Sequence, residues 1–409
     1  MARGLVHRSL QRIEVGRLTI QDPWGTRSFG HAKENAAGDL RDVHLHVTDP
    51  RFYPKIAAGG DVGAGEAFIR GWWQCDNLVG LIRMMIANDA SLRTIQSRWG
   101  AAVELWNRAR HWFRSNTRSG SRRNIAAHYD LSNDFYRLFL DPTMMYSCGI
   151  FESPTGTMHD ASIAKLDRVC RKLRLRPGDH LLEIGTGWGG LALHAARNYG
   201  CRVTTTTISR QQHEYAAARI AEAGLENRIT LLFEDYRDLR GQFDKLVSIE
   251  MIEAVGHRYY DAYFRQCCRL LRPHGAALIQ AITIADRYYA AARDRVDFIK
   301  KFVFPGSCIP SISAMMSSIA RHTDLTLVHL EDITPHYATT LARWREAFMQ
   351  RRSDVRALGL GDAFIRLWEF YLAYCEAGFR ERTIGNVQML FHKPGCAEAP
   401  PLPPGPALI

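Results

Sequence analysis

The ten residues Leu181–Gly190, LLEIGTGWGG, combine one carboxylate with four glycines. Gly185, Gly187 and Gly190 have the spacing G-x-G-x-x-G, which permits a tight turn between a strand and a helix and a close approach of a ligand to the backbone. This spacing alone is shared by sites for NAD, FAD and S-adenosylmethionine. A phosphate loop of the Walker A type is excluded, because no Gly-Lys-Ser/Thr sequence follows.

The residues after the turn distinguish between these ligands. A dinucleotide site needs an acidic residue about 20 residues further on, at the end of the second strand. The chain has TTTTIS at 204–209, and no carboxylate lies between the turn and Glu214. Glu183, two residues before the first glycine, can face the ammonium and sulfonium groups of S-adenosylmethionine. The pattern therefore favours S-adenosylmethionine over NAD.

The elements that must position this turn alternate along the chain. Strand patterns occur at HLLEIG, CRVTTTTI, RITLLFEDY, FDKLVSIEM and GAALIQAIT, and helical patterns at LALHAARNY, HEYAAARIAEAG and YYDAYFRQCCRLL. This order predicts an α/β fold with a doubly wound, Rossmann-like parallel sheet that binds its ligand at the carboxyl ends of the strands. Residues 1–110 mix a strand pattern, VHLHVTD, with a helical pattern at 63–89, and predict a smaller N-terminal α+β domain.

Composition divides the chain into four predicted segments. They are a lipid- or partner-interacting domain (1–110), a basic linker (111–124), the α/β domain (125–393) and a disordered Pro-rich tail (394–409). An apolar stripe that includes Trp72 and Trp73 suits either core packing or an acyl-chain or subunit surface. The arginines of the linker suit either solvent or anionic headgroups.

Charge and cysteine content limit the partners and the compartment. The formal net charge of +11 suits an anionic partner, either nucleic acid or a membrane, and a basic enzyme without such a partner stays an alternative. The nine cysteines include no C-x-x-C pair and no zinc-type cluster, which predicts reduced thiols, a cytoplasmic location and no metal site. We find no secretory signal pattern and no run near the ~18 apolar residues of a membrane span, so membrane contact is expected to be peripheral.

Five segments, in this order, resemble the cyclopropane-fatty-acid synthase family of S-adenosylmethionine-dependent methyltransferases, including its mycolic-acid-modifying members. They are HYDLSNDFYRLFLDPTMMYSCGIF (128–151), LLEIGTGWGG (181–190), SIEMIEAVGHRYYDAYF (248–264), FIKKFVFPGSCIPSI (298–312) and PHYATTLARW (335–344). The resemblance covers about residues 120–395, and it is looser over the N-terminal domain. It implies a class I methyltransferase fold for 125–393.

The resemblance also implies a reaction. The methyl carbon of S-adenosylmethionine is added to the cis double bond of an unsaturated acyl chain in a membrane phospholipid, which leaves S-adenosylhomocysteine. A bound bicarbonate takes a proton from the resulting carbocation, and a cyclopropane ring closes. Because some relatives form methyl-branched or methylene products, such a product stays the alternative.

The same resemblance implies where the enzyme works. It is expected on the anionic inner face of the plasma membrane, bound peripherally, and as a possible homodimer. Nucleic acid is not expected as a substrate, because SIEMIEAVG stands where a nucleic-acid methyltransferase would carry N/D-P-P-Y/F/W. A carbocation must be kept from water, and aromatic faces stabilise cations. The candidates to line such a cavity are Phe135, Tyr136, Tyr146, Trp188, Phe304 and Tyr337.

By resemblance, the bicarbonate pocket consists of Cys148, Glu253, Gln280, the backbone at Ile282, and Tyr337. Glu253 is preferred over Glu250 because the family's acid immediately precedes A-V-G or H-V-G, and Glu250 is expected to cap or to face solvent. A buried Glu253 beside an anion predicts a raised pKa. The expected cofactor contacts are Tyr146, Ser147, Glu183, Gly185, Thr186, Gly187, Trp188, Gly189, Gly190, Thr207, Ile208, Ser209, Gln212, Asp235 and Tyr236.

Three of these residues leave questions open. Many family members carry histidine where this chain has Gln280; an amide can donate a hydrogen bond to an anion but cannot relay a proton. Cys148 is interpreted as lining the anion pocket, with a buried inert thiol as the alternative. Cys375 matches a cysteine proposed as catalytic in the family, although its neighbours on an apolar helix favour a place in the core.

Overall fold

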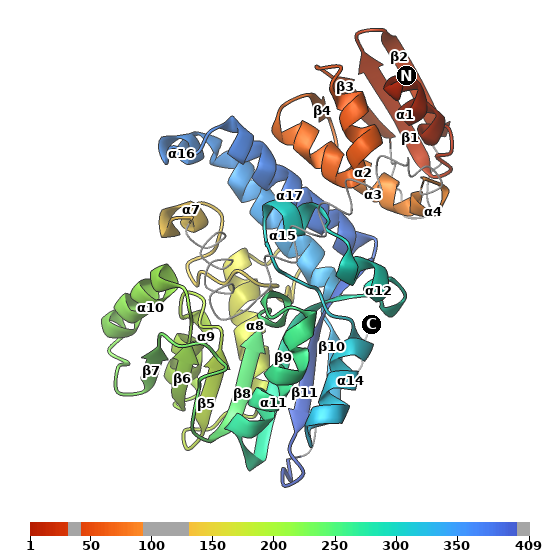
Figure 1. Cartoon of the computed structure of the whole chain (residues 1–409). Helices are drawn as coiled ribbons and strands as arrows, with labels where there is room; N and C mark the ends of the chain where they lie inside the picture. The colour runs from red at the N-terminus through yellow and green to blue at the C-terminus, as the bar shows by residue number, and fades with distance from the viewer. Residues whose placement is uncertain (32–41, 93–130, 399–409) are drawn as a thin grey trace. The chain divides into compact units, whose positions relative to one another are not determined.

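The computed structural model describes residues 1–31, 42–92 and 131–398, which form two compact units (Figure 1). The first unit consists of Met1–Arg114, Asp294–Pro305 and Ala338–Thr383, and the second of Ser115–Arg293, Gly306–Tyr337 and Ile384–Ile409. Each unit is therefore assembled from segments far apart in the sequence. The predicted linker at 111–124 and residues 399–409 of the predicted tail lie outside the described residues.

The second unit is built on a seven-stranded sheet in the order β10-β11-β9-β8-β5-β6-β7. The pairs from β7 to β9 are parallel, whereas β11 is antiparallel to β9 and to β10. The strands are β5 (His180–Ile184), β6 (Arg202–Thr206), β7 (Ile229–Leu232), β8 (Phe243–Ile249), β9 (Leu271–Ile284), β10 (Thr326–Asp332) and β11 (Ile384–His392). All five strands predicted from the sequence are present, although β7 ends earlier and β9 begins earlier than expected.

Helices cover both faces of this sheet. Those that lie or begin in the second unit are α7 (Asn133–Arg137), α8 (Met158–Lys172), α9 (Gly190–Asn198), α10 (Arg210–Glu222), η1 (Ile252–Ala254), η2 (His257–Tyr259), α11 (Tyr260–Leu270), α12 (Asp286–Asp294), α14 (Ile312–His322) and α15 (Thr334–Gln350). The start of α8 is stabilised by a capping box between Thr157 and Asp160.

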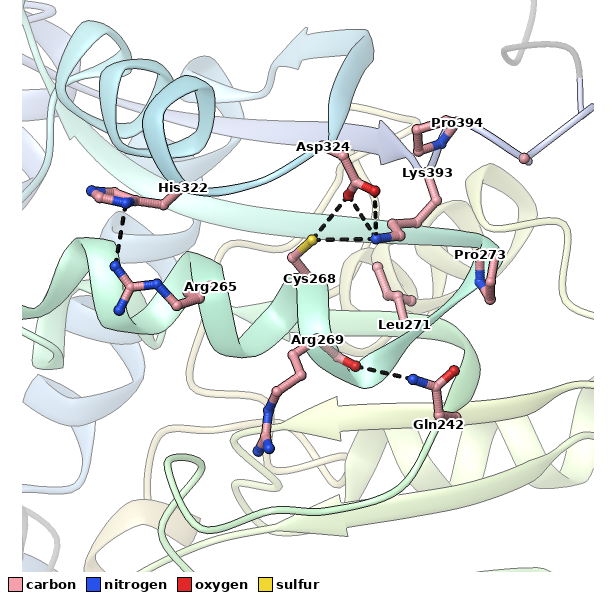
Figure 2. Close-up of a pocket in the computed structure, with 11 residues that line it drawn as sticks. Gln242, Arg265, Cys268, Arg269, Leu271, Pro273, His322, Asp324, Lys393 and Pro394 are labelled. Atoms are coloured by element: carbon pink, nitrogen blue, oxygen red, sulfur yellow. Dashed lines mark hydrogen bonds and ion pairs between the residues drawn. The ribbon is translucent and has the colours of Figure 1, made fainter.

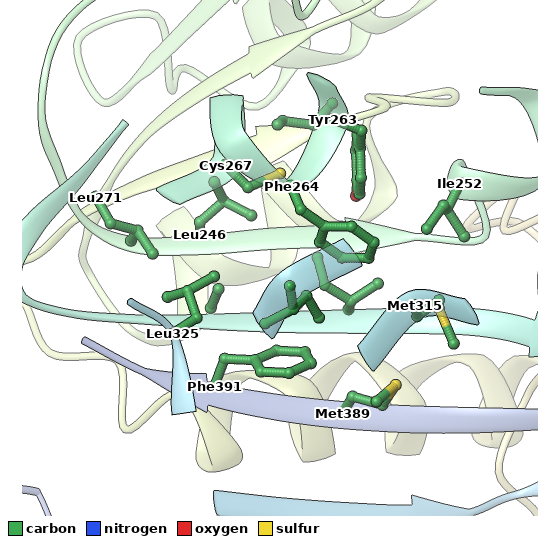
Figure 3. Packing of buried hydrophobic residues seen from close by; sticks show 14 of the residues in the cluster. Leu246, Ile252, Tyr263, Phe264, Cys267, Leu271, Met315, Leu325, Met389 and Phe391 are labelled. Carbon is green, nitrogen blue, oxygen red and sulfur yellow. The ribbon is translucent and has the colours of Figure 1, made fainter. Parts of the chain in front are cut away.

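Two apolar cores lie on opposite sides of the sheet, because successive residues of a strand point to opposite faces. Leu182 and Leu246 pack with residues of α11 and α14 in one core, part of which Figure 3 shows. Leu181 and Val247, each adjacent in sequence to one of these, pack with residues of α8 and α9 in the other core. The predicted doubly wound α/β sheet is confirmed.

The first unit has the α+β character predicted for residues 1–110, but it also includes Asp294–Pro305 and Ala338–Thr383, which we had assigned to the α/β domain. Its sheet has the order β2-β1-β3-β4, with a parallel pair between β1 and β3 and antiparallel outer pairs. Its elements are β1 (Gly16–Asp22), β2 (Gly25–His31), β3 (Asp42–Val47), β4 (Trp73–Cys75), α1 (Ala2–Leu10), α2 (Phe52–Ile69), α3 (Leu78–Ala87), α4 (Asp89–Leu92), α13 (Phe298–Phe302), α16 (Arg352–Ala357) and α17 (Asp362–Arg380).

The helix expected across 63–89 is interrupted. Gly71 has φ of 71°, a left-handed conformation that ends a helix at little cost for glycine, and the chain then forms β4. Trp73 is buried in that strand and packs against Phe68 and Phe370 at ring distances of 4.9 and 6.5 Å. Core packing is therefore the interpretation that the structure supports for Trp73. Among the described helices, none has both the length and the apolar character that crossing a bilayer requires.

Candidate active site

The glycine-rich turn joins the end of β5 to the start of α9. Gly185, Gly187 and Gly189 have φ of 101°, 54° and 85°, which favour glycine over residues with a side chain. The backbone N–H groups of Gly185 and Thr186 both donate to the carbonyl of Thr206, at 3.1 and 3.0 Å. No described heavy atom outside its chain neighbours lies within 4 Å of where a Cβ would stand on Gly187. The turn therefore leaves open space at the carboxyl edge of the sheet.

Glu183 lies at the end of β5, directly before this turn. Its side chain is buried, and its Oε2 accepts a hydrogen bond of 2.6 Å from the hydroxyl of Thr205. Burial raises the pKa of Glu183 to about 8, against the opposing effects of Thr205 and of the Lys165 charge. Lys165 is fully buried and donates to the hydroxyl of Ser147 at 2.8 Å. Burial lowers the pKa of Lys165 to about 8, against the opposing effect of nearby acidic groups that include Glu183. Glu183 and Lys165 therefore both titrate near pH 8 and influence one another electrostatically.

The other predicted cofactor contacts gather near the ends of β5 and β6. Trp188 donates from Nε1 to the side-chain oxygen of Asn133 at 2.7 Å. Thr207 donates to Oε1 of Gln212 at 2.9 Å, while Ser209 caps α10. Thr186 and Gly190 belong to the turn after β5 and Ile208 to the segment after β6, whereas Tyr146 lies between α7 and α8.

Asp235 and Tyr236 follow β7 and already have partners. Asp235 forms a two-point ion pair with Arg237, with the shortest contact at 2.7 Å. Tyr236 packs edge-on against Tyr263 at 5.5 Å. Their contact with the adenine end of a nucleotide stays a prediction, and Arg237 would compete for the Asp235 carboxylate.

These residues fit S-adenosylmethionine. A buried carboxylate at the strand end suits the ligand's ammonium or sulfonium group, because a cation restores its charged form. The open space at Gly187 suits a ligand close to the backbone, and the hydroxyl and amide groups at the end of β6 suit a ribose.

A second polar cluster surrounds the carboxylate of Glu250, the residue directly after β8. Its Oε1 accepts hydrogen bonds from the backbone N–H of Cys148 (3.1 Å), Nε2 of Gln280 (2.8 Å) and Nδ2 of Asn386 (2.6 Å). Its Oε2 accepts one from the hydroxyl of Tyr337 (2.6 Å). Glu250, which we expected to cap or to face solvent, is thus the common acceptor of the predicted anion pocket.

Glu253 lies one turn further on, in the short helix η1. Its Oε1 accepts from the backbone N–H of Ile282 at 2.5 Å, as the predicted pocket requires, and its buried Oε2 has no hydrogen-bond partner among the described residues. Burial, reinforced by the charge of Glu250, raises the pKa of Glu253 to about 8. The raised pKa agrees with the expectation, although the neighbouring anion in this structure is Glu250.

A buried polar chain leads away from this cluster and was missed in the sequence. Oε1 of Gln280 accepts from Gln388 at 2.9 Å, whose own Oε1 accepts from Nζ of Lys172 at 2.7 Å. Lys172 in turn pairs with Glu331 at 2.5 Å. The available signal was the polar pair Asn386 and Gln388, which lies on one face of the otherwise apolar strand β11.

The two cysteines singled out in the sequence differ in their surroundings. The Cys148 thiol is buried and faces the carbonyls of Gly149 and Ile333 at 3.2 and 3.9 Å, so this residue lines the cluster through its backbone N–H. Cys375 lies on α17 in the first unit, where burial raises the pKa of its thiol. Phe304 also belongs to the first unit. The raised pKa of the Cys375 thiol is the opposite of the depressed pKa that a nucleophilic cysteine needs.

Four aromatic candidates of the second unit form one cluster beside the glycine turn. Tyr136 lies 4.8 Å from Trp188 and 5.4 Å from both Phe135 and Tyr146, measured between ring centroids. Phe135 and Tyr136 are fully buried, whereas Tyr146 is partly exposed.

A surface pocket of about 510 Å³ lies at the opposite end of the strands, where β9 begins (Figure 2). Its lining includes Cys268, Asp324 and Lys393, which contact one another. None of the predicted site residues lines it. The pocket is therefore distinct from the cluster at the carboxyl ends.

Comparison with known proteins places these features in a family. The sequence profile described as mycolic acid cyclopropane synthetase matches residues 116–389. Tuberculostearic acid methyltransferase UfaA1 of Mycobacterium tuberculosis is 40% identical over 386 residues, which cover 90% of this chain and 87% of the relative. The cyclopropane-fatty-acyl-phospholipid synthase of Escherichia coli K12 is 34% identical over 356 residues, covering 85% of this chain and 87% of the relative.

The fold has solved counterparts. The crystal structure of mycolic acid cyclopropane synthase CmaA1 complexed with SAH and CTAB aligns with a TM-score of 0.62 and 33% identity, over 66% of this chain and 98% of that chain. This similarity confirms the predicted class I methyltransferase fold.

Proposed function

Because the chain belongs to the mycolic acid cyclopropane synthetase family, whose members transfer methyl groups to lipid acyl chains, we propose its substrate and product. The substrate is a membrane phospholipid with a cis-unsaturated acyl chain. The product carries a cyclopropane ring in place of the double bond. S-adenosylmethionine supplies the methyl carbon and becomes S-adenosylhomocysteine.

The role of the residues follows from the weakness of an alkene as a nucleophile. An alkene cannot be activated by removing a proton, so the protein must hold it in line with the methyl group and keep water away. Glu183 and the glycine turn hold the cationic part of the cofactor. The aromatic cluster of Tyr136, Tyr146 and Trp188 provides an apolar wall beside that turn.

One observation carries the proposal: two carboxyl groups and their donors meet at the carboxyl ends of β8 and β9, and β8 pairs with β5, the strand that carries Glu183. Ligands of such sheets bind at this edge. A methyl transfer to an alkene needs a proton acceptor near the transferred carbon, and this cluster supplies acceptors there.

The bicarbonate predicted as the base does not fit the donors in this structure. Cys148, Gln280 and Tyr337, three of the residues expected to hold it, donate to the carboxylate of Glu250. A bicarbonate in the same place would meet an anion that already has those donors. We therefore assign no step to bicarbonate.

A methyl-branched or methylene product is the second candidate. The 40% identical relative is named a tuberculostearic acid methyltransferase, and that name describes a methyl transfer and mentions no cyclopropane. Gln280, in place of the histidine common in the family, is consistent with a difference in the fate of the carbocation. The alkylation step is the same for both products.

The expected surroundings of the enzyme remain proposals. The net charge of +11 supports peripheral contact with the anionic inner face of the plasma membrane. A cytoplasmic location and a homodimer accord with the resemblance, and nucleic acid is not a proposed partner.

The test uses the full-length protein with methyl-labelled S-adenosylmethionine and vesicles of a cis-unsaturated phospholipid. We expect label in the acyl chains, and vesicles of a saturated phospholipid serve as the matched control. Mass spectrometry then separates the products: a gain of CH₂ indicates a ring or a methylene group, and a gain of CH₄ a saturated branch. NMR of the ring protons distinguishes the first two.

Transfer to the free fatty acid but not to the phospholipid would contradict the proposed substrate. Equal label in saturated and unsaturated vesicles would contradict alkylation of a double bond. Label in added DNA or RNA would replace the proposal with nucleic-acid methylation.

A further inference from the structure

The geometry points to the carboxylate of Glu250 as the base that removes the proton after methyl transfer, in the place that the resemblance assigns to bicarbonate. The inference rests on the proposed function and concerns its second step. It identifies a catalytic residue on the chain itself in place of an anion taken from solution.

The hydrogen bonds around Glu250 support this role. Both a carboxylate and a bicarbonate present two oxygens on one planar carbon, and the Glu250 oxygens accept from Cys148, Gln280 and Tyr337 at 3.1, 2.8 and 2.6 Å. Asn386 adds a fourth donor at 2.6 Å. The four donors thus surround a single anion. That anion is the side chain of Glu250, the residue directly after β8.

Charge in the cluster argues in the same direction. Lys165 is buried, and the charge of Glu250 favours its protonated form against the effect of burial. A bicarbonate bound to the same donors would lie next to the Glu250 carboxylate, and two negative charges so close together repel strongly. Glu253 carries a raised pKa partly because of Glu250, so it is the group that stays protonated.

The backbone of Glu250 gives an independent observation. Its φ is 49°, a left-handed conformation that costs a residue with a side chain roughly 1 kcal/mol or more. Its N–H donates to the carbonyl of Gln280 at 2.8 Å, which pins the strained residue to β9. Strain of this kind persists where the surrounding structure holds a side chain in one direction, and here that direction is toward the four donors.

The chemical step is balanced without another reactant. Methyl transfer to one alkene carbon leaves a cation on the neighbouring carbon. Glu250 then takes a proton from the new methyl group, and the electron pair of that C–H bond forms the third bond of the ring. For a methylene product, a hydride shift first moves the cation to the methylated carbon, and the same C–H pair becomes the double bond. In both cases Glu250 becomes a carboxylic acid and later loses its proton to water.

Two substitutions and bicarbonate depletion test the inference. Glu250→Gln keeps the shape but removes the base, and Glu250→Gly removes the side chain and relieves the left-handed strain. Label transfer to unsaturated vesicles is measured in buffer freed of carbon dioxide, with and without added bicarbonate. Glu226→Gln, at an exposed position far from the cluster in sequence, is the matched control.

We expect the wild type and the control to be indifferent to bicarbonate. Glu250→Gln should lose at least 100-fold in rate under both conditions, since general bases contribute about 10²–10⁴-fold. Glu250→Gly should be inactive without bicarbonate and regain part of the rate, saturably, when bicarbonate fills the vacated donors. Calorimetric affinity for S-adenosylmethionine should stay within threefold for every variant, which shows that the fold and cofactor site are intact.

The inference is overturned if depletion slows the wild type several-fold and bicarbonate restores it, or if Glu250→Gln keeps more than a third of the rate. Either result leaves the proposed function in place. If the wild type binds S-adenosylmethionine but labels no acyl chain under any condition, the proposed function fails and the inference fails with it.

Discussion

Binding of S-adenosylmethionine should release a proton from Glu183, and replacing this residue with glutamine should abolish that release. The carboxyl group is buried at the end of β5 and has a pKa of about 8. At pH 7 it is protonated in about nine of ten molecules. A cationic ligand stabilises the ionised form, so the proton must leave when the ligand binds.

The size of the effect follows from that pKa. Between pH 6 and 8 the affinity of the wild type should rise about tenfold per pH unit, and it should level off above pH 8. At pH 8, Glu183→Gln should bind about 10- to 150-fold more weakly, which corresponds to about 1.5–3 kcal/mol for a hydrogen bond to a charged group. Its affinity should vary little with pH over the same range.

Isothermal titration calorimetry measures both quantities. The binding enthalpy at pH 7 is determined in buffers of different ionisation enthalpy, and the slope gives the protons released. We expect about 0.9 proton for the wild type and near zero for Glu183→Gln. Lys165, whose pKa is also about 8, loses a proton in the same range, so the variant is needed to assign the proton to Glu183. Glu226→Gln should behave as the wild type.

A wild-type affinity that stays constant between pH 6 and 8, with no proton released, would contradict the release of a proton from Glu183. The prediction is also refuted if Glu183→Gln binds as tightly as the wild type at pH 8. In the second case, the cofactor would not contact this carboxylate.

Three further predictions concern the cluster around Glu250. Tyr337→Phe keeps the ring but removes the 2.6 Å hydrogen bond, so the rate of label transfer should fall about 10- to 100-fold with unchanged cofactor affinity; an unchanged rate contradicts the role of the hydroxyl. Cys148→Ala keeps the backbone donor and should stay within threefold of the wild-type rate, whereas a 100-fold loss would indicate chemistry by the thiol. The pKa of Glu253 rises from an ordinary 4.5 to about 8 on folding, so the stability it contributes is fully present below pH 4.5 and is lost as the pH rises through 8. Denaturant titrations should thus show wild-type stability decreasing with pH by up to ~1.4 kcal/mol per unit more than that of Glu253→Gln, and parallel curves would contradict the raised pKa.

The sequence was sufficient for the five parallel strands from β7 to β9 and for the cofactor turn, because both depend on local patterns. It did not predict the antiparallel strands β10 and β11. Alternating apolar runs and amphipathic segments specify strands and helices within a few residues of one another. The left-handed conformations at Gly185, Gly187 and Gly189 restrict their positions to glycine, so the turn can be recognised from residue types alone. Glu183 could be identified by its place in the same short segment.

The proton acceptor could not be identified in this way. Glu250 and Glu253 are three residues apart, and their spacing does not indicate which carboxyl group faces the donors. The donors Cys148, Gln280 and Tyr337 come from three distant segments, and Asn386 from a fourth. Family pattern favoured Glu253, and it did not indicate that Glu250 would accept all of these hydrogen bonds.

Local chemistry thus encodes which residues can form a strand end, a glycine turn or a buried carboxyl group, because backbone conformation and burial pattern act over short distances. The assignment of charge among Glu183, Lys165, Glu250 and Glu253 depends on which donors and counterions surround each of them after folding. Those neighbours are set by the order in which β5, β8, β9 and β11 lie side by side. Electrostatic interactions depend on distance in space, and for that reason the tertiary structure alone decides which carboxylate is available as a base.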